Sequence, residues 1–299
     1  MNKIALITGV TGFIGGELAR RLIRDKWSVA IVVREGSDLS SIEDIVTAAV
    51  TYRHDGTTES LTSIVREVKP DVVFHLASLF LADHVSEQVA ELISSNILFG
   101  AQLLEAMATC GVRNIVSAGT SWQNYHSESY RAVNLYAATK QAFEDILSFY
   151  VDKYSISSVV LKLFDTYGHA DKRRKLITLI VDAISNSSEL GVSPGGQVID
   201  ISHIDNVVEH FLRAGLFCIS KESSSTDTFF VSGERFTVKE LVSAIESAAG
   251  LKASITYGAR PYRDREVMYL PAIDGKTPPW NNQVERTTLR QGILTLLNS

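Results

Sequence analysis

The chain has 299 residues, of which 45% are hydrophobic and 21% are charged, and its net charge is −5 at pH 7. This balance is typical of a folded globular protein and excludes a disordered chain. The acidic net charge disfavours nucleic acid or an anionic membrane as a partner, because both require a basic face. No apolar stretch approaches the roughly 20 residues that cross a bilayer, and the first apolar run is too short for a secretory signal.

Two cysteines, Cys110 and Cys218, lie far apart in the sequence and have no CxxC spacing. They therefore predict neither a disulfide framework nor a structural zinc site, and we expect no bound metal. Isolated thiols are typical of a reducing compartment. We accordingly expect a cytoplasmic protein.

The first half of the chain alternates short apolar runs with longer amphipathic stretches. The spacing of Ile14, Leu18 and Leu22 predicts a helix from Phe13 to Arg24. Further helices are expected over 61–68, over a long stretch ending near 110–111, and over 136–150. Strands are expected over 4–7, 28–33, 49–53, 71–76, 114–117 and 158–163. Continuous apolar strands separated by helices predict a doubly wound parallel sheet of the Rossmann type, which binds ligands at the carboxyl ends of its strands.

After about Tyr167 the alternation loosens, which indicates a smaller second lobe. A charge run over 171–175 precedes an expected helix over 176–184 and a turn-rich loop over 191–196. Later elements are expected as strands over 198–201, 228–231 and 253–257, and as helices over 205–217 and 238–249. We expect a dinucleotide-binding domain over 1–166, with return segments at about 197–217 and 226–232. An interleaved α/β substrate lobe is expected over 167–299.

A glycine-rich loop connects the first strand to the first helix, with the sequence Thr8-Gly9-Val10-Thr11-Gly12-Phe13-Ile14-Gly15. The three glycines allow a tight turn, close approach of the backbone to a pyrophosphate and close packing of helix on sheet. The free N–H groups at the start of the helix then point at the anion. This segment therefore predicts cofactor contacts from Gly9, Thr11, Gly12, Phe13, Ile14 and Gly15.

The residues after the second strand bear on the choice of dinucleotide. An acidic residue there usually binds the ribose of NAD, whereas this chain has Val33-Arg34-Glu35. The guanidinium of Arg34 could pair with the 2′-phosphate of NADPH, and the adjacent Glu35 favours the opposite choice. We expect NADPH, with NAD as the alternative.

Tyr136 and Lys140 stand four residues apart in an expected helix, so that their side chains share one face. A nearby ammonium is expected to lower the pKa of the phenol, which could then exchange a proton with a carbonyl or carbinol oxygen. The fifth strand ends in Ser117-Ala118-Gly119-Thr120-Ser121-Trp122. A hydroxyl at that strand end could polarise the same oxygen.

The glycine loop, the strand-end hydroxyl and the Tyr-Lys helix, in this order, resemble the extended short-chain dehydrogenase/reductase family. More narrowly, they resemble its nucleotide-sugar epimerases, dehydratases and ketoreductases, and the resemblance covers nearly the whole chain. It implies that Thr120, Tyr136 and Lys140 are catalytic, with Ser121 as the alternative hydroxyl. It implies further cofactor contacts from Asp55, Gly56, Leu76, Ala77, Ser78 and Asn96, in addition to Tyr136 and Lys140 themselves.

The same resemblance implies a nucleotide-diphosphate sugar as the substrate. At the position of Asp165 the family usually has an asparagine, and the residue at this position contacts substrate phosphate. Two basic groups, one containing Arg173 and one containing Arg260, are candidates for the diphosphate. The expected substrate contacts are Ser121, Trp122, Asp165, Arg173 and Arg260. Trp122 is either a sugar-stacking residue or a core residue.

The residues directly after Thr120 narrow the choice of reaction. Dehydratases of this family carry an Asp-Glu pair there, whereas this chain has Ser121-Trp122, which disfavours dehydration. The segments 119–123 and 163–168 resemble the CDP-abequose and CDP-paratose synthase type of enzyme, which reduces a nucleotide-linked 4-keto-6-deoxyhexose for surface polysaccharide. We expect this reduction. The alternatives are a 4-epimerase with tightly bound NAD and a non-catalytic dinucleotide sensor. The resemblance also implies a homodimer that pairs through the helices flanking the fifth strand.

Overall fold

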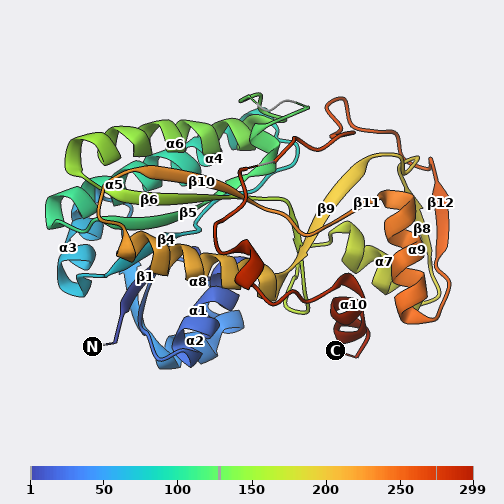
Figure 1. The fold of residues 1–299 in the computed structure, drawn as a ribbon, viewed down its shortest axis with the longest axis horizontal. Coiled ribbons are helices and arrows are strands. Elements are labelled where there is room, and N and C mark those ends of the chain that lie inside the picture. Colours follow the sequence, from blue (N-terminus) through green and yellow to red (C-terminus); the bar gives the residue numbers. More distant parts are fainter. Residues whose placement is uncertain (1, 127–128, 274, 299) are drawn as a thin grey trace.

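The computed structural model describes residues 2–126, 129–273 and 275–298 of the chain. Its larger lobe is a seven-stranded sheet in the order β10-β6-β5-β4-β1-β2-β3, and every pair of neighbours is parallel (Figure 1). The strands are β1 (Ile4–Thr8), β2 (Ser28–Arg34), β3 (Val50–His54), β4 (Val72–His75), β5 (Asn114–Thr120), β6 (Ser157–Leu163) and β10 (Thr226–Val231). The strand order reverses between β1 and β4, which confirms the predicted doubly wound α/β fold.

Helices cover both faces of this sheet. One face carries α1 (Phe13–Arg24), α2 (Glu43–Ala48) and α8 (Ile204–Ser220), and the other carries α3 (Thr58–Val68), α5 (Phe99–Cys110) and α6 (Leu135–Tyr154). The two faces have separate hydrophobic cores, one around Phe74 and Phe211 and one around Leu6 and Leu103. Strands buried on both sides need apolar residues at consecutive positions, which explains the continuous apolar runs in the sequence.

The segment between β4 and α5 contains short helical turns. These are η2 (Ser86–Gln88), α4 (Val89–Ile93) and the π-helical turn η3 (Ser94–Leu98), which leads directly into α5. The long helix expected to end near Cys110-Gly111 therefore begins as several shorter elements. Gly111 follows α5 in the left-handed conformation, which ends the helix where the sequence predicts.

The smaller lobe lies at one end of the large sheet (Figure 1). It contains a three-stranded sheet of β7 (Asp165–Tyr167), β9 (Val198–His203) and β11 (Glu234–Thr237), and a pair formed by β8 (Glu189–Val192) and β12 (Ser254–Tyr257). Its helices are α7 (Leu176–Ser185), α9 (Val238–Ala249) and α10 (Leu289–Leu297). The prediction of a loop over 191–196 is wrong for its first two residues, because Gly191 and Val192 belong to β8 and pair with β12.

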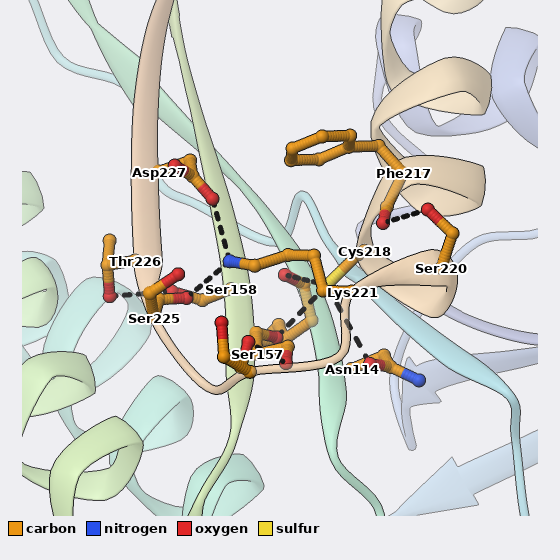
Figure 2. A network of polar contacts seen from close by, with 12 residues as sticks. Asn114, Ser157, Ser158, Phe217, Cys218, Ser220, Lys221, Ser225, Thr226 and Asp227 are labelled. Carbon is orange, nitrogen blue, oxygen red and sulfur yellow. Dashed lines mark hydrogen bonds and ion pairs between the residues drawn. The ribbon is translucent and has the colours of Figure 1, made fainter.

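The chain passes between the lobes more than once. β9 pairs with β7 and β11 in the small sheet, whereas α8 and β10, which come later in the chain, lie on the large sheet. Figure 2 shows the polar network that fixes the connection from α8 to β10. There the Lys221 ammonium donates to the Asp227 carboxylate at 2.7 Å, and the buried Cys218 thiol donates to the Ser157 carbonyl at 3.0 Å. Both cysteines are free thiols, and no helix of the described residues is long and apolar enough to cross a membrane.

Candidate active site

The glycine loop lies tightly against the segment after β4. Gly9 has a φ of +78°, and a Cβ at this position would come within 2.5 Å of the Ala77 nitrogen. A Cβ on Gly15 would overlap the Gly9 carbonyl oxygen. The N-cap of α1 is Gly12, so no side chain caps the helix, and its first turn contains no acidic residue. The N–H groups of this turn are therefore available to an anion, and the loop fits a dinucleotide pyrophosphate.

A first cavity of about 630 Å³ opens at the carboxyl ends of β1, β2 and β4. This volume is within the usual range of small-molecule and cofactor sites. Of the predicted cofactor residues it is lined by Gly9, Thr11, Gly12, Arg34, Asp55, Gly56, Leu76, Ala77 and Ser78. Residues that the sequence did not single out also line it, among them Ser37, His54, Glu91, Leu98 and Phe99.

Arg34 ends β2 with an exposed side chain at this cavity. Its guanidinium has neither a hydrogen bond nor an ion pair within the described ranges. The loop behind it is held by Arg53, whose guanidinium donates to the carbonyl oxygens of Arg34 and Glu35 at 3.3 and 2.5 Å. Asp55 has a local role, because its carboxylate accepts from the backbone and hydroxyl of Thr57, and these bonds lower its pKa.

Asn96, predicted as a cofactor contact, lines neither this cavity nor the adjoining one around Tyr136. Its buried side chain accepts from the Ser78 hydroxyl at 3.1 Å and the Leu79 N–H at 2.7 Å, and it donates to the Thr139 hydroxyl at 2.9 Å. Asn96 thus ties the loop after β4 to helix α6. It positions residues that line the cavities.

A second cavity of about 240 Å³ adjoins the first, and both are lined by Gly9, Gly12, Leu76 and Ser78. It brings together the ends of β5 and β6, the first turn of α6 and the start of the smaller lobe. Of the predicted site residues it is lined by Phe13, Ile14, Gly15, Thr120, Ser121, Trp122, Tyr136, Lys140, Asp165 and Arg173. The proposed catalytic residues therefore converge at the carboxyl end of the sheet.

The N-cap of helix α6, Asn134, holds the first turn of the helix in place, and this turn carries Tyr136 at the cavity. The Asn134 side chain accepts from the Ala137 N–H at 2.9 Å and donates to the Ala82 carbonyl at 2.7 Å, which anchors the first turn to the loop after β4. Lys140 lies one turn further along and is 5% exposed. Burial lowers the pKa of Lys140 to about 8, against the opposing charge of Glu144.

The pKa of Tyr136 differs from the prediction. Burial raises the pKa of Tyr136 to about 12, while hydrogen bonding with Ser78 and the charge of Arg173 act to lower it. The prediction of a lowered pKa is therefore wrong, because the loss of hydration outweighs the effects that favour the phenolate. At neutral pH the Tyr136 hydroxyl therefore carries its proton and can donate it.

Two hydroxyls lie at the end of β5. Thr120 and Ser121 are 9% and 7% exposed, and both line the second cavity. The Thr120 hydroxyl also accepts from the Trp122 N–H at 3.3 Å, which fixes its place at the start of the next turn, η4 (Ser121–Gln123). Trp122 lies at the cavity wall and is partly exposed.

Phe80 is a site residue that sequence reasoning missed. Its ring is 43% exposed and lies edge-on to Tyr136, with 5.0 Å between the ring centroids. It is also 5.6 Å from the Trp122 ring, and the Lys175 ammonium lies 5.9 Å from its centroid. An apolar residue in a loop carries no motif, so only the contact with Tyr136 identifies Phe80.

The basic group over 171–175 reaches the second cavity. Lys175 forms an ion pair of 2.8 Å with Asp165, and both line the cavity. Burial acts to raise the pKa of Asp165, but Lys175, Arg173 and Arg263 lower it overall. Arg173 is held by Asp171 at 2.6 Å, with its guanidinium 5.1 Å from the Phe13 ring centroid.

Arg260, in contrast, lines neither cavity. Its backbone N–H donates to the Val192 carbonyl beside the pair of strands β8 and β12. Of the second basic group, Arg263 is the residue whose charge acts on Asp165. The two arginines are close in sequence, but only Arg263 acts on a residue that lines the second cavity.

Comparisons with known proteins identify the family of the chain. The model of the NAD dependent epimerase/dehydratase family matches residues 5–221. A CDP-abequose synthase of Yersinia pseudotuberculosis is 27% identical over 267 residues, which cover 88% of this chain and 90% of the relative. A UDP-glucose 4-epimerase of Mycolicibacterium smegmatis is 27% identical over 265 residues, 82% of each chain. The structure of a UDP-glucuronic acid 4-epimerase from Bacillus cereus, in complex with UDP-glucuronic acid and NAD, has the same fold: its TM-score is 0.82 at 19% identity, over 99% of this chain and 98% of that chain.

Proposed function

The chain belongs to the NAD dependent epimerase/dehydratase family, and from that premise we propose that it reduces the 4-keto group of a nucleotide-linked 4-keto-6-deoxyhexose with NADPH. The observation that carries the proposal is the cavity in which a protonated Tyr136 and the hydroxyl of Thr120 meet beside the dinucleotide cavity. The similarity to CDP-abequose synthases supports the same class of substrate. The product would serve deoxysugar and surface polysaccharide synthesis.

Three residues would have separate roles in the reaction. A bound dinucleotide would supply the hydride, and Tyr136 would give its hydroxyl proton to the carbonyl oxygen, so that a ketone, a hydride and a proton would yield an alcohol. Thr120 donates a hydrogen bond to the same oxygen as negative charge develops there. The Lys140 ammonium stabilises the phenolate that remains, which then recovers a proton from solvent.

Elimination of water needs a carboxylate that is free to remove a proton. Ser121 and Trp122, the residues after Thr120, supply none. Asp165 does line the cavity, but its carboxylate is paired with Lys175 at 2.8 Å, and its lowered pKa makes it a weak base. These features disfavour dehydration and leave hydride transfer as the reaction.

The walls of the second cavity favour a deoxysugar. Phe80, Trp122 and Phe164 line it, and the Phe80 ring, which contacts both Tyr136 and Trp122, offers apolar surface next to Tyr136. A 6-deoxyhexose carries a methyl group where an ordinary hexose carries a hydroxymethyl group. A methyl group gains free energy on burial against such rings, whereas an unpaired hydroxyl loses its hydration there.

The choice of NADPH is supported by the unpaired guanidinium of Arg34 at the first cavity. The adjacent Glu35 also lines that cavity, and NAD is the alternative cofactor. A cytoplasmic location is part of the proposal, since both thiols are free and nicotinamide dinucleotides are the expected hydride source.

We also propose a homodimer. Large apolar side chains are exposed on the helices that flank β5: Val89, Ile93 and Phe149 are 37%, 40% and 53% exposed. They lie on α4 and α6, as a pairing through these helices requires. Exposed apolar residues gathered on adjoining elements are typical of an interaction surface.

A 4-epimerase with tightly bound NAD is the second candidate, because UDP-glucose 4-epimerases are about as similar to the chain as the synthases are. An epimerase would use the same Tyr136 and Thr120, first as acceptor and then as donor of the proton. A non-catalytic dinucleotide sensor is the third candidate. The presence of both Tyr136 and Lys140 at the cavity disfavours it.

Absorbance at 340 nm tests the proposal. The purified protein receives NADPH or NADH together with CDP- or dTDP-4-keto-6-deoxyglucose, and we expect stoichiometric loss of NADPH absorbance that Tyr136→Phe abolishes. Tyr52→Phe is the matched control, because it removes a phenol that bonds Glu67 and lines neither cavity. No net oxidation, with NAD released only on denaturation, would refute reduction in favour of epimerisation.

A further inference from the structure

A cluster of buried polar side chains lies directly behind the end of β5. Its members are Gln123 on the turn after β5, Glu144 on α6 and Lys162 on β6. Gln123 is 0% exposed, and the side chains of Glu144 and Lys162 are 14% and 10% exposed. The Gln123 amide donates to one Glu144 oxygen at 2.9 Å, and the other oxygen lies 3.7 Å from the Lys162 ammonium. Such groups are rarely buried without a role in structure or function.

Gly119 makes room for this cluster. A Cβ on Gly119 would stand 3.0 Å from the Glu144 carboxylate, 3.0 Å from a methylene carbon of Lys162 and 3.1 Å from the Gln123 amide oxygen. All three side chains therefore meet against the backbone of the residue that precedes Thr120. Even an alanine at this position would push them away from the strand end.

The cluster is bonded to the backbone of Thr120. The Gln123 amide oxygen accepts from the Thr120 N–H at 2.9 Å. The Gln123 amide nitrogen donates at the same time to Glu144 and to the Gln141 amide oxygen, each at 2.9 Å, so these two side chains fix the orientation of the amide. A continuous path of hydrogen bonds thus runs from Glu144 through Gln123 to Thr120.

The cluster also acts on Lys140. Glu144 lies one helical turn after Lys140 on the same face of α6, and its charge favours the ammonium form of Lys140. The charged groups that face Glu144 are Lys140 and Asp145 on its own helix and Lys162 on β6, and Gln123 and Gln141 supply the neutral polar contacts. Two buried ammoniums thus share one carboxylate.

We propose that Glu144 is a positioning residue of the active site, which orients Thr120 through Gln123 and is the counter-ion that keeps Lys140 charged. The inference rests on the proposed function in one respect, namely that Thr120, Tyr136 and Lys140 are the catalytic groups. Without the Glu144 charge, nothing would oppose the burial that lowers the pKa of Lys140, and Lys140 would release its proton at lower pH. The phenolate left by Tyr136 would then lose its neighbouring cation.

Glu144→Gln tests the proposal, because it removes the charge and preserves the size of the side chain. Asp152→Asn is the matched control: it removes an exposed carboxylate of the same helix that lies two turns further along and outside the cluster. The lysine titration is measured by NMR on protein with ¹³C-labelled lysine side chains, with Lys140 assigned from the Lys140→Met variant. In Glu144→Gln we expect the proton affinity of Lys140 to fall roughly tenfold, and the alkaline limb of the pH–rate profile to move to lower pH by the same factor. Asp152→Asn should change neither.

An unchanged Lys140 titration in folded Glu144→Gln protein would overturn the proposal. If Glu144→Gln does not fold, Glu144→Asp replaces it, because aspartate retains the charge but is too short to reach Gln123 in the same way. That variant should lower kcat with little effect on KM, and an unchanged kcat would overturn the orienting role. The lysine titration requires no substrate, so a protein that reduces no sugar would refute the proposed function and still leave this inference decided by NMR.

Discussion

Replacing Gly9 by alanine is the sharpest test of how the glycine loop is built. The added Cβ meets two obstacles: the backbone has a φ of +78°, and the Ala77 nitrogen and the Leu76 carbonyl carbon would each lie 2.5 Å away. The left-handed conformation costs a non-glycine residue about 1–2 kcal/mol. Overpacking against fixed backbone costs about 1–3 kcal/mol more. The free energy of unfolding should therefore fall by about 2–5 kcal/mol, the sum of these two costs.

Gly250→Ala is the matched control. Gly250 ends α9 with a φ of +67°, and a Cβ there would meet no atom within 4 Å, so it isolates the conformational cost. Denaturant unfolding measures both variants, and NADPH fluorescence measures cofactor binding. We expect the loss of stability to be larger in Gly9→Ala and only that variant to lose the cofactor. Equal losses of stability in the two variants would show that the loop does not pack closely against residues 76–77.

Four further predictions concern the site and the pH dependence of stability. Thr120→Val should lower kcat by roughly 10²- to 10³-fold and Ser121→Ala much less; the reverse order would make Ser121 the polarising hydroxyl. Phe80→Ala should raise the KM for the sugar nucleotide by about 3- to 10-fold with little change in the KM for NADPH. Arg34→Ala should raise the KM for NADPH by about 10-fold and leave that for NADH unchanged, and equal effects on both would refute a 2′-phosphate contact. Burial lowers the pKa of His75 to about 3 and of His210 to about 4, below the unfolded value of 6.5, so the unfolded chain binds more protons between these limits. The free energy of unfolding should therefore fall by about 1–2 kcal/mol for each histidine from pH 7 to pH 5, and His210→Gln should remove its share; a flat profile in denaturant unfolding would contradict this.

Much of the large lobe could be predicted because local sequence and fold agree there. In the small lobe, α9 has the bounds that the sequence predicts, Val238–Ala249, since Thr237 and Glu240 form a capping box and Gly250 ends the helix. The glycine loop and the Tyr-Lys helix are recognisable because their chemistry needs fixed residue spacings. The short strands β7 and β11 were not predicted, because three or four residues carry no measurable periodicity.

The parts of the site that escaped prediction depend on distant contacts. Phe80 meets Tyr136 from a loop far away in the sequence, and Glu144 meets Lys162 on another element. The prediction for the pKa of Tyr136 considers the charge of Lys140 alone, whereas burial, which spacing does not reveal, decides it. The prediction for Arg260 depends on its neighbours in sequence, although Arg263 is the arginine whose charge acts on Asp165.

β10 is synthesised long after β6, the strand with which it pairs, and this delay affects folding during synthesis. β6 is buried along its whole length and pairs with β5 on one side, but its other partner, β10, is completed only at Val231. While the ribosome makes residues 164–225, which lie between β6 and β10, β6 is an edge strand with an apolar surface. Unpaired edges of this kind invite association with other chains. Nascent chains that stall before β10 should therefore be the aggregation-prone species and the ones that chaperones bind.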